Sequence, residues 1–455
     1  MAIQHKTITS LPNVNIKGGF ETPITGVSID TRSLNAGDLF VAFIGSQVDG
    51  HDFIPKAISR GASAVMASTS WDGCEAWEAH IPLIMTDDPI KSLADLATAH
   101  RKLFDIPLIA ITGTNGKTSS KNLLSHILGK RYTVLSTEGN FNNHIGLPIT
   151  LLNLNESHDM AVIEMGASQK GDIKYLCDIA QPNQGLITNI SLAHTEFFHD
   201  IDTIQSTKGE LFEYLGKNAG RAFVNIDDPR VLELAENCTN SVHYGFGKEC
   251  EHHFRLAGPD NQGNYDIQIL KFSAHLNQAG KAIALNAAAA SAIALHNGIR
   301  YDELQSALED YPGEAGRMQH EQVGEIHFYN DAYNSNPAST QAGFETISEM
   351  QISGRKVLIF ADMLELGSLS TEAHANAGKQ IIDAGFDVAI LVGTETQHTT
   401  DSLNKQDFNT LFYSADKAEA TKYFLENIRA GDLVYLKGSR GMQLETFIEA
   451  YKENK

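Results

Sequence analysis

A glycine-rich turn with a lysine and a hydroxyl residue stands out in PLIAITGTNGKTSSKNLL, residues 107–124. The apolar run predicts a strand that enters the turn, and a helix is expected to leave it. Glycines let backbone N–H groups turn toward phosphate oxygens, and a helix N-terminus adds its positive dipole. Lys117 can then reach terminal phosphates, and the Thr118 hydroxyl can hold Mg²⁺. The predicted nucleotide-binding residues are Gly113, Thr114, Asn115, Gly116, Lys117, Thr118 and Ser119.

The turn departs from the general phosphate-loop pattern G-x-x-x-x-G-K-[ST], because Ile111 stands where the first glycine belongs. A plain strand-to-helix turn is the alternative, but strand, Gly-Lys-Thr and helix in this order favour nucleotide binding.

Glu164 ends a second apolar run, MAVIEMG. A carboxylate at the carboxyl end of a parallel strand beside a phosphate loop can bind Mg²⁺. A solvated glutamate at a loop end fits the spacing equally well.

The overall charge restricts the class of partner. A formal net charge of -21 repels phosphate backbones and anionic lipids, so we expect neither nucleic acid nor a membrane as partner. The four cysteines form no close pair, which argues against a zinc or redox site and fits a reducing compartment. MAIQHKTITSLPNV, at the N-terminus, lacks the apolar core of a signal peptide, and residues 282–295 are too short to span a bilayer. A cytoplasmic protein is expected.

The apolar runs alternate with helical segments along most of the 455 residues, which predicts an α/β fold with mainly parallel sheets. We expect three domains. Residues 1–104 form a small α/β domain, and residues 105–312 form a central parallel-sheet domain of the P-loop ATPase kind. After the YPGEAGR linker, residues 313–455 repeat the alternation as a C-terminal Rossmann-like domain. This part lacks G-x-G-x-x-G, so it does not indicate a dinucleotide.

Several motifs together resemble the Mur ligase family over essentially the whole chain. They are TGTNGKT (112–118), GNFNNHIGLPITLL (139–152), VIEMGAS (162–168), NISLAHTEFF (189–198), STKGELF (206–212), NDAYNSNP (330–337), ADMLELG (361–367) and LKGSRG (436–441). The resemblance implies a ligase that activates a carboxylate as an acyl phosphate with ATP and two Mg²⁺ ions. The Y-N-x-N-P element indicates the member that adds D-alanyl-D-alanine to UDP-N-acetylmuramoyl-tripeptide in peptidoglycan precursor synthesis. A monomer is expected.

The resemblance also assigns catalytic roles to Lys117, Glu164, His194, Lys208 and Arg317. Glu164 and His194, with Thr118, become Mg²⁺ ligands, and Lys208 becomes a carbamylated lysine that supports the second ion. On the residues alone, His194 would be a surface or core histidine and Lys208 a solvated helix charge. Arg317 is assigned to phosphate and Asp331 to ribose, although Asn330 replaces a common aspartate. Asn286 is assigned to adenine, although Ala282 and Ile283 replace a common His-Asn pair.

Substrate-binding residues are implied in three regions. The segment VSIDTRSLNAGDLFVAFIGSQVDGHDFI resembles a UDP-binding domain. Its expected contacts are Ser28, Asp30, Thr31 and Arg32, with Asp49, Gly50 and His51 nearby. The muramoyl-peptide is assigned to Asn140, Asn142 and Asn143, with His144, Ser168 and Gln169 as departures from common residues. The dipeptide is assigned to Tyr333, Asn334, Asn336, Lys437, Ser439 and Arg440. Ser439 can equally be a plain helix cap.

Other functions remain open at this point. A related ligase that adds a single amino acid to a muramoyl-peptide, or a folylpolyglutamate synthase, would share the phosphate loop. A phosphate-loop ATPase that works as a switch or motor would share the loop but form no amide. The N-terminal UDP-like segment argues against the ATPase.

Overall fold

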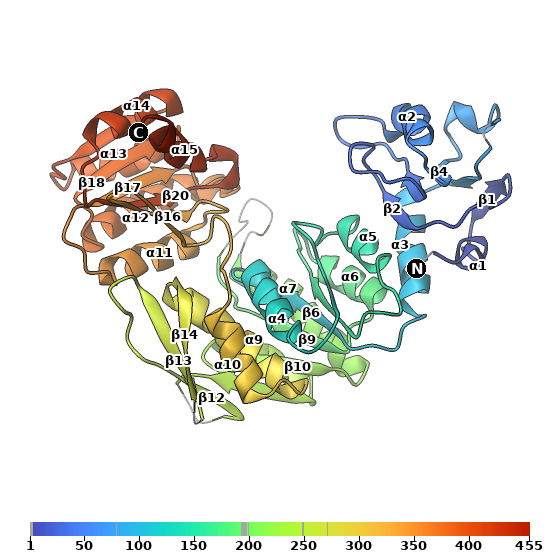
Figure 1. The fold of residues 1–455 in the computed structure, drawn as a ribbon, viewed down its shortest axis with the longest axis horizontal. Coiled ribbons are helices and arrows are strands. Elements are labelled where there is room, and N and C mark those ends of the chain that lie inside the picture. Colours follow the sequence, from blue (N-terminus) through green and yellow to red (C-terminus); the bar gives the residue numbers. More distant parts are fainter. Residues whose placement is uncertain (1–2, 79, 193–197, 199, 248–249, 271) are drawn as a thin grey trace.

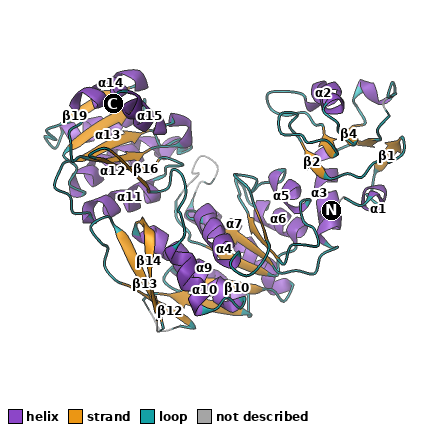
Figure 2. Cartoon of the chain, viewed as in Figure 1, coloured by secondary structure: helices purple, strands orange, loops and turns teal. Residues whose placement is uncertain are grey.

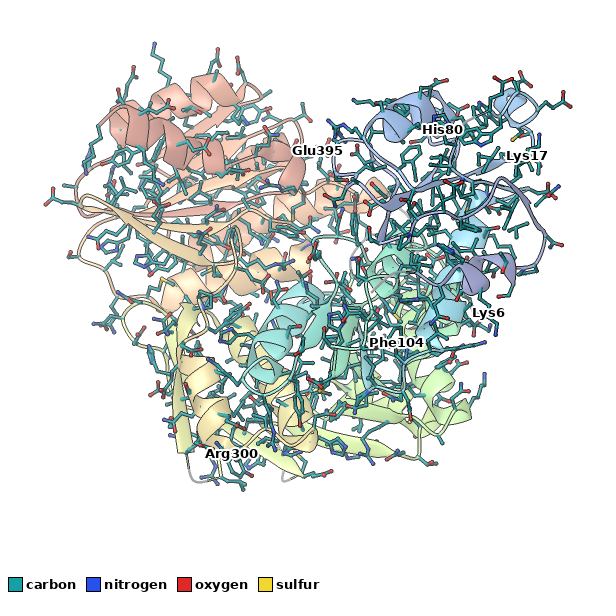
Figure 3. All side chains as sticks on the ribbon, turned by 45° about the vertical axis from the view of Figure 1, so that its right-hand side comes forward. Lys6, Lys17, His80, Phe104, Arg300 and Glu395 are labelled. Atoms are coloured by element: carbon teal, nitrogen blue, oxygen red, sulfur yellow. The ribbon has the colours of Figure 1, made fainter. Side chains whose placement is uncertain are left out.

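Three α/β units follow one another along the chain and lie in an open arc (Figure 1). The computed structural model describes every residue except 1–2, 79, 193–197, 199, 248–249 and 271. Helices lie against the faces of the sheets throughout (Figure 2). Lys17 and His80 mark the first unit in Figure 3, and Glu395 marks the last. The three-part α/β architecture expected from the sequence is confirmed.

The first unit holds a five-stranded sheet in the order β1-β5-β4-β3-β2, in which only β1 runs antiparallel. Its strands are β1 Val14–Lys17, β2 Gly26–Ser28, β3 Asp38–Val41, β4 Ala64–Ser68 and β5 Leu83–Thr86. Its helices are α1 His5–Thr9, η1 Gly50–Phe53, α2 Ile54–Ser59, η2 Asp72–Cys74 and α3 Pro89–Arg101. Helix α3 leads into the central unit, where the buried Arg101 donates from Nε to Ala180 O at 3.1 Å.

The central sheet has nine strands in the order β14-β13-β12-β11-β10-β9-β6-β8-β7. The strands are β6 Leu108–Thr112, β7 Val134–Ser136, β8 Met160–Glu164, β9 Gln184–Ile187, β10 Arg221–Asn225, β11 Ser241–Gly245, β12 His252–Leu256, β13 Asn264–Ile269 and β14 Phe272–Ala279. The helices are α4 Lys117–Leu128, α5 Gly146–Leu151, α6 Asp172–Ala180, α7 Ile201–Lys217, α8 Pro229–Leu234, η3 Ala235–Asn237, α9 Lys281–His296 and α10 Tyr301–Glu309. Strands β12 to β14 pair antiparallel, an extension that the helix-strand alternation did not predict.

The third unit holds six strands in the order β15-β16-β20-β17-β18-β19, parallel except for the β15–β16 hairpin. The strands are β15 Gln319–Val323, β16 Ile326–Asp331, β17 Lys356–Ala361, β18 Val388–Val392, β19 Leu411–Ser414 and β20 Leu433–Lys437. The helices are α11 Pro337–Glu349, η4 Gly367–Leu369, α12 Ser370–Asp383, α13 Thr396–Asn404, α14 Lys417–Asn427, η5 Arg440–Met442 and α15 Glu445–Glu453.

The β13–β14 hairpin ties the central unit to the third one. Tyr265 on β13 donates its hydroxyl to Glu349 on α11 at 2.7 Å, and Tyr329 on β16 donates to Gln262 O at 3.3 Å. These bonds join α11 and β16 of the third unit to β13 and the residues just before it. Across the described residues, no helix has the length and apolar character needed to cross a membrane.

Candidate functional site

A cavity of about 830 Å³ lies between the central and third units. The following predicted site residues line it: Gly113, Thr114, Asn115, Gly116, Lys117, Thr118, Ser119, Asn140, Asn142, Asn143, Glu164, Lys208, Asn286, Arg317, Asp331, Tyr333, Asn334, Asn336 and Lys437. Residues separated by more than 300 positions therefore face one space. His194 lies outside the described residues, and the N-terminal candidates and Ser439 and Arg440 are not among the lining residues.

Two glycines give the phosphate loop its shape. Gly113 has φ 139° and Gly116 has φ 79°, a region that side chains rarely adopt. A Cβ on Gly113 would collide with the Thr188 hydroxyl, and one on Gly116 would collide with the side-chain oxygen of Asn286. Both positions therefore require glycine, which the sequence pattern anticipated.

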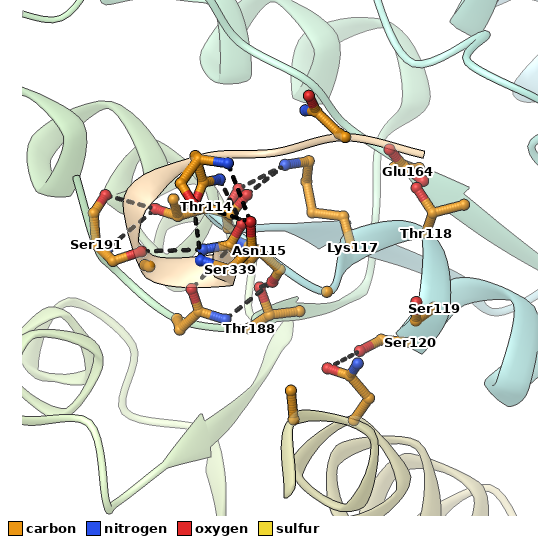
Figure 4. A pocket seen from close by; sticks show the side chains of 18 of the residues that line it. Thr114, Asn115, Lys117, Thr118, Ser119, Ser120, Glu164, Thr188, Ser191 and Ser339 are labelled. Atoms are coloured by element: carbon orange, nitrogen blue, oxygen red, sulfur yellow. Dashed lines mark hydrogen bonds between the residues drawn. The ribbon is translucent and has the colours of Figure 1, made fainter. Parts of the chain in front are cut away.

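The loop is fastened to the segment that follows β9. Thr114 N–H donates to Asn189 O at 2.9 Å, and Asn115 N–H donates to Asn189 Oδ1 at 3.1 Å. The Thr188 hydroxyl donates to Asn115 O at 2.7 Å, and Ser191 N–H donates to Thr114 Oγ1 at 3.0 Å (Figure 4). Thr114 and Asn115 thus use their N–H groups to hold the loop in place. The N–H groups that begin α4 have no partner inside the helix and remain available to an anion.

Lys117 folds back over the loop it belongs to. Its Nζ donates to Gly113 O at 2.9 Å and to Thr114 O at 3.0 Å (Figure 4). Burial lowers the pKa of Lys117, whereas the charge of Glu164 raises it. A partly buried ammonium whose hydrogen bonds go only to neutral carbonyls is under-compensated, so a phosphate group in the loop would be a better partner.

Glu164 carries an unsatisfied oxygen at the end of β8. The residue is 2% exposed, and its Oε1 accepts from Asn142 Nδ2 at 2.7 Å. Its buried Oε2 has no hydrogen-bond partner among the described residues. Thr118 lies on the same side of the loop in Figure 4. An orphaned carboxylate oxygen and a hydroxyl that line one cavity fit Mg²⁺, which prefers oxygen ligands.

No group of three His, Cys, Asp or Glu side chains gathers as a metal site within the ranges that the structure describes. Mg²⁺ usually keeps several waters and binds through one or two carboxylates together with substrate phosphates. Glu164 and Thr118 therefore suffice for one ion, whereas a second ion would need further ligands.

Lys208 is buried on the inner face of α7. Burial and, as the second cause, the positive charge of Lys117 together lower its pKa to about 7. Its Nζ lies 5.6 Å from the centre of the Phe198 ring. The reading as a solvated helix charge is therefore wrong. An amine with a pKa near 7 is substantially neutral at neutral pH and can act as a nucleophile.

Asn286 lies one turn inside α9, which begins at Lys281 rather than at the asparagine. Its Oδ1 accepts from the Ser120 hydroxyl at 3.3 Å and lies close to Gly116. Ala282 and Ile283, the departures from the family pattern, also line the cavity. The apolar pair gives this part of the cavity a surface suited to a flat ring rather than to charge.

A charged cluster forms the wall contributed by the third unit. Lys437 Nζ donates to Asp331 Oδ2 at 2.7 Å, and the Tyr435 hydroxyl donates to the same oxygen at 3.0 Å. Met318 N–H donates to Asp331 Oδ1 at 3.2 Å, and Lys437 also donates to Asn334 O at 3.0 Å. Both oxygens of Asp331 are engaged, so a ribose hydroxyl would have to share them.

Arg317 and Tyr333 form a stacked pair at the edge of this wall. The guanidinium carbon lies 4.4 Å from the ring centre, and Arg317 Nε lies 3.1 Å from Glu314 Oε2. Asn336 caps α11 by accepting from Ser339 N–H at 2.9 Å and donates to Asn115 Oδ1 at 2.8 Å. The Asn336 bond joins the third unit directly to the phosphate loop.

The asparagines assigned to the muramoyl-peptide have different surroundings. Asn142 donates to Glu164, whereas Asn143 Oδ1 accepts from Ile145 and Gly146 N–H at 3.0 and 2.9 Å, just before α5. Asn140 lines the cavity, together with two of the noted departures, His144 and Ser168. Gln169 is not among the lining residues; its N–H donates to Asp172 at 3.0 Å.

Ser439 and Arg440 lie apart from the cavity. Ser439 stands at the N-cap position of η5, as the helix-cap alternative expects, but its side chain makes no capping hydrogen bond and its hydroxyl instead accepts from Leu364 N–H at 2.8 Å. Arg440 donates to Glu445 at 2.7 Å and is largely exposed.

The N-terminal candidates form a local turn. Arg32 makes a bidentate contact with Asp30, with bonds of 2.9 and 2.6 Å to Oδ2, and Ser28 donates to Asp30 O at 2.9 Å. Thr31 is buried, and its carbonyl accepts from Arg60. His51 Nδ1 lies 2.6 Å from Asp49 Oδ1, close to Gly50 in η1. Arg32 is the exposed cation of this turn, and its guanidinium is paired with Asp30.

Sequence reasoning missed the residues that support the site. Thr137 accepts from Glu164 N–H at 3.0 Å and, through its carbonyl, from Lys121 Nζ at 2.6 Å. Asn189 and Glu314 act in the same supporting way. The only available signal was polar residues directly after apolar strands, which does not say which partner each one serves.

Three family models match consecutive parts of the chain. The model described as "Mur ligase family, catalytic domain" matches residues 23–101. "Mur ligase middle domain" matches residues 111–294, and "Mur ligase, glutamate ligase domain" matches residues 316–440.

Similar proteins extend over nearly the full length. The UDP-N-acetylmuramoyl-tripeptide--D-alanyl-D-alanine ligase of Bacillus subtilis (strain 168) is 30% identical over 439 residues, 94% of this chain and 93% of that protein. The protein of the same name from Escherichia coli (strain K12) is 30% identical, covering 98% of both. A crystal structure of MurF from Acinetobacter baumannii matches with a TM-score of 0.85 at 27% identity, covering 95% and 94%. MurF ligase from Thermotoga maritima in complex with ADP matches with 0.81 at 25% identity, covering 94% and 97%.

Proposed function

The chain belongs to the Mur ligase family, and we propose that it joins D-alanyl-D-alanine to UDP-N-acetylmuramoyl-tripeptide with ATP, in peptidoglycan precursor synthesis. One observation carries the proposal. The phosphate loop, the orphaned oxygen of Glu164 and the charged wall of the third unit line a single cavity. Amide formation from a carboxylate needs these three parts, because phosphate must be transferred to the acid before the amine attacks.

The first part of the reaction belongs to the central unit. The N–H groups at the start of α4 and the ammonium of Lys117 hold the phosphates of ATP. Glu164 and Thr118 would hold Mg²⁺, which supplies charge neutralisation between the nucleotide and the peptide carboxylate. His194, which lies outside the described residues, is proposed as a further ligand. A carboxylate oxygen of the tripeptide then bonds to the terminal phosphorus of ATP, the bond from that phosphorus to the bridging oxygen breaks, and ADP leaves.

We include carbamylation of Lys208 in the proposal. The neutral amine attacks CO₂, a C–N bond forms, one proton leaves, and the side chain becomes an anion. The lowered pKa near 7 supports this step, because only the unprotonated amine is nucleophilic. A buried anion near Lys117 would also relieve the repulsion between the two lysines.

The second part belongs to the wall of the third unit. Arg317 would contact phosphate through its planar fork, and Asp331 would accept from the ribose. Tyr333, Asn334, Asn336 and Lys437 surround the space from which the dipeptide amine approaches. Phosphate leaves when the amine adds to the acyl carbon, and the proton of the amine leaves with it.

The remaining assignments concern regions outside the cavity. The UDP end of the substrate would be held by Ser28, Asp30, Thr31 and Arg32, with the exposed Arg32 toward its phosphates.

We propose a cytoplasmic enzyme, because ATP and the UDP-linked tripeptide are both nucleotide compounds. We also propose a monomer, since the central and third units of one chain both line the cavity.

Product formation tests the proposal. Purified protein is mixed with ATP, Mg²⁺ and UDP-N-acetylmuramoyl-tripeptide, and either D-alanyl-D-alanine or single amino acids are added. The expected product is the pentapeptide, with phosphate release dependent on the dipeptide. Phosphate release driven by a single amino acid would favour another ligase of the family, and release without any amine would favour a plain ATPase.

A further inference from the structure

Arg317 is held from two sides. Its Nε lies 3.1 Å from Glu314 Oε2, and its Cζ lies 4.4 Å from the centre of the Tyr333 ring. Arg317 lines the cavity, but Glu314 is not among the lining residues. The carboxylate therefore contacts the guanidinium from outside the lining of the cavity.

Glu314 has a second partner on its far side. The Tyr311 hydroxyl donates to Glu314 Oε1 at 3.2 Å. Burial, followed by the charge of Glu314, raises the pKa of Tyr311 far above its ordinary value, so the hydroxyl stays a donor. The Tyr311 ring meets the edge of His126 at 5.4 Å, and His126 belongs to α4, the helix that starts at the phosphate loop. The carboxylate thus connects Arg317 to the body of the central unit.

The backbone around Arg317 is fixed as well. Its N–H donates to Glu314 O at 3.3 Å, and its carbonyl accepts from Gln278 at the end of β14. Tyr333 N–H donates to Gly316 O at 2.9 Å. The turn of residues 314–317 is bonded to both units, so the carboxylate and the guanidinium meet from fixed positions.

We propose that Glu314 is a positioning residue that fixes the guanidinium of Arg317 for contact with the phosphates of ATP. The inference rests on the proposed function, because it assumes that the cavity binds ATP. Glu314 approaches the Nε side and Tyr333 covers one face, which leaves the Nη edge for two phosphate oxygens. A free arginine would lose side-chain freedom on binding phosphate, and this clamp removes that freedom beforehand.

The contact between Glu314 and Arg317 could also have the opposite effect on activity. In that case Glu314 would compete with phosphate for Arg317 and would slow the reaction. The two readings differ in sign: loss of the carboxylate lowers activity if it positions the arginine and raises activity if it competes.

Five variants make the test: Glu314→Gln, Glu314→Asp, Arg317→Ala, the double variant Glu314→Gln/Arg317→Ala, and Glu309→Gln as the matched control. Glutamine has one acceptor oxygen and cannot serve both Tyr311 and Arg317, whereas aspartate keeps both acceptors on a shorter stem. Glu309 is an exposed carboxylate at the end of α10, five residues earlier. Thermal unfolding checks that each variant is folded.

We expect Glu314→Gln to lower kcat about 100-fold, since small misplacements of a phosphate-contacting group have effects of this size. Arg317→Ala should lose about 1,000-fold, the double variant should match Arg317→Ala alone, and Glu314→Asp should recover part of the loss. Glu309→Gln should match the wild type. A purely structural role would instead give independent losses in the double variant.

The dissociation constant of ATP, measured without peptide or dipeptide, separates the two proposals. It should rise in Glu314→Gln and Arg317→Ala but not in Glu309→Gln. Wild-type protein that binds ATP but forms no pentapeptide would overturn the proposed function and leave the binding series to decide the inference. Wild-type affinity in Glu314→Gln, additive losses, or a raised kcat would each overturn the positioning role, as would a wild type that does not bind ATP.

Discussion

The cavity has two walls that are built in different ways. The phosphate-loop wall comes from one short segment, residues 113–119, braced by Asn189 and its neighbours. It leaves an under-compensated ammonium on Lys117 and an orphaned oxygen on Glu164. The wall of the third unit brings together Arg317, Asp331 and Lys437, and each already has a charged partner. The first wall therefore has polar groups that a bound ligand would pair with. The charged groups of the second wall already have partners in the protein, which fix their positions.

Lys117 gives the largest expected effect and tests the first half of this comparison. Lys117→Met should lower product formation by more than about 1,000-fold, because a fixed cation on the transferred phosphate is lost. The protein should unfold at the same temperature or higher, since a partly buried and poorly paired charge has been removed. Initial rates and thermal unfolding measure the two effects. The exposed Lys102→Met serves as control, and a loss below tenfold would contradict the prediction.

Glu164→Gln comes next and separates metal binding from nucleotide binding. The amide can still accept from Asn142, but it has lost the charge that a Mg²⁺ ion needs. We expect a loss of about 100-fold and a higher Mg²⁺ concentration for half-maximal rate. A Mg²⁺ titration of the rate measures both, with the exposed Glu156→Gln as control. An unchanged Mg²⁺ requirement would show that the orphaned oxygen serves something other than the metal.

Lys208, which lines the same cavity, gives a pH-dependent test. Its amine becomes neutral as the pH rises through about 7, so reaction with CO₂ should be slow below that pH and faster above it. Enzyme stripped of CO₂ should regain activity on addition of bicarbonate, and recovery at pH 8 should exceed recovery at pH 6. Lys208→Ala should lose roughly 100-fold and recover partly with a short carboxylate. Lys217→Ala, on the exposed end of α7, should behave like the wild type, and a fully active Lys208→Ala would refute the carbamate.

The sequence predicted the first wall well for a physical reason. A phosphate loop depends on glycines at two backbone positions and on a helix start directly after them, and all of these lie within a few residues. The strand before the loop and the strand ending at Glu164 were also readable, because buried parallel strands form continuous apolar runs. The packing of Gly113 and Gly116 against Thr188 and Asn286 explains why no other residue fits.

The second wall was less readable because its contacts join distant segments. No pattern of neighbouring residues in the sequence shows that Lys437 pairs with Asp331, or that Glu314 contacts Arg317. The antiparallel strands β12 to β14 were missed for a related reason. Burial alternates along β13 and β14, so these strands lack the continuous apolar runs by which the parallel strands were recognised. Family resemblance named residues on this wall, but it did not show their partners.

Lys437→Met tests whether the second wall is mainly structural. Removing the ammonium leaves Asp331 with hydrogen bonds from Tyr435 and Met318 but without a counter-charge. Breaking a buried pair of this kind costs about 3 kcal/mol. Hydrogen exchange of β16 and β20 should therefore become faster, while Lys405→Met on the surface changes nothing. Loss of dipeptide affinity without faster exchange would instead make Lys437 a direct substrate contact.

Arg440 gives the smallest expected effect and is the sharpest test of where the second wall ends. The family resemblance assigns it to the dipeptide, yet it lies outside the cavity, largely exposed, and paired with Glu445 at 2.7 Å. An exposed pair of this kind is worth less than about 1 kcal/mol, so Arg440→Ala should change the KM for D-alanyl-D-alanine by less than threefold. Glu445→Gln, which frees the arginine without removing it, should have no larger effect. A tenfold rise in KM for Arg440→Ala alone would mean that the wall extends to Arg440 once substrates are bound. The third unit would then have to move relative to the phosphate loop, and the Asn336–Asn115 bond between them would be the first contact expected to break.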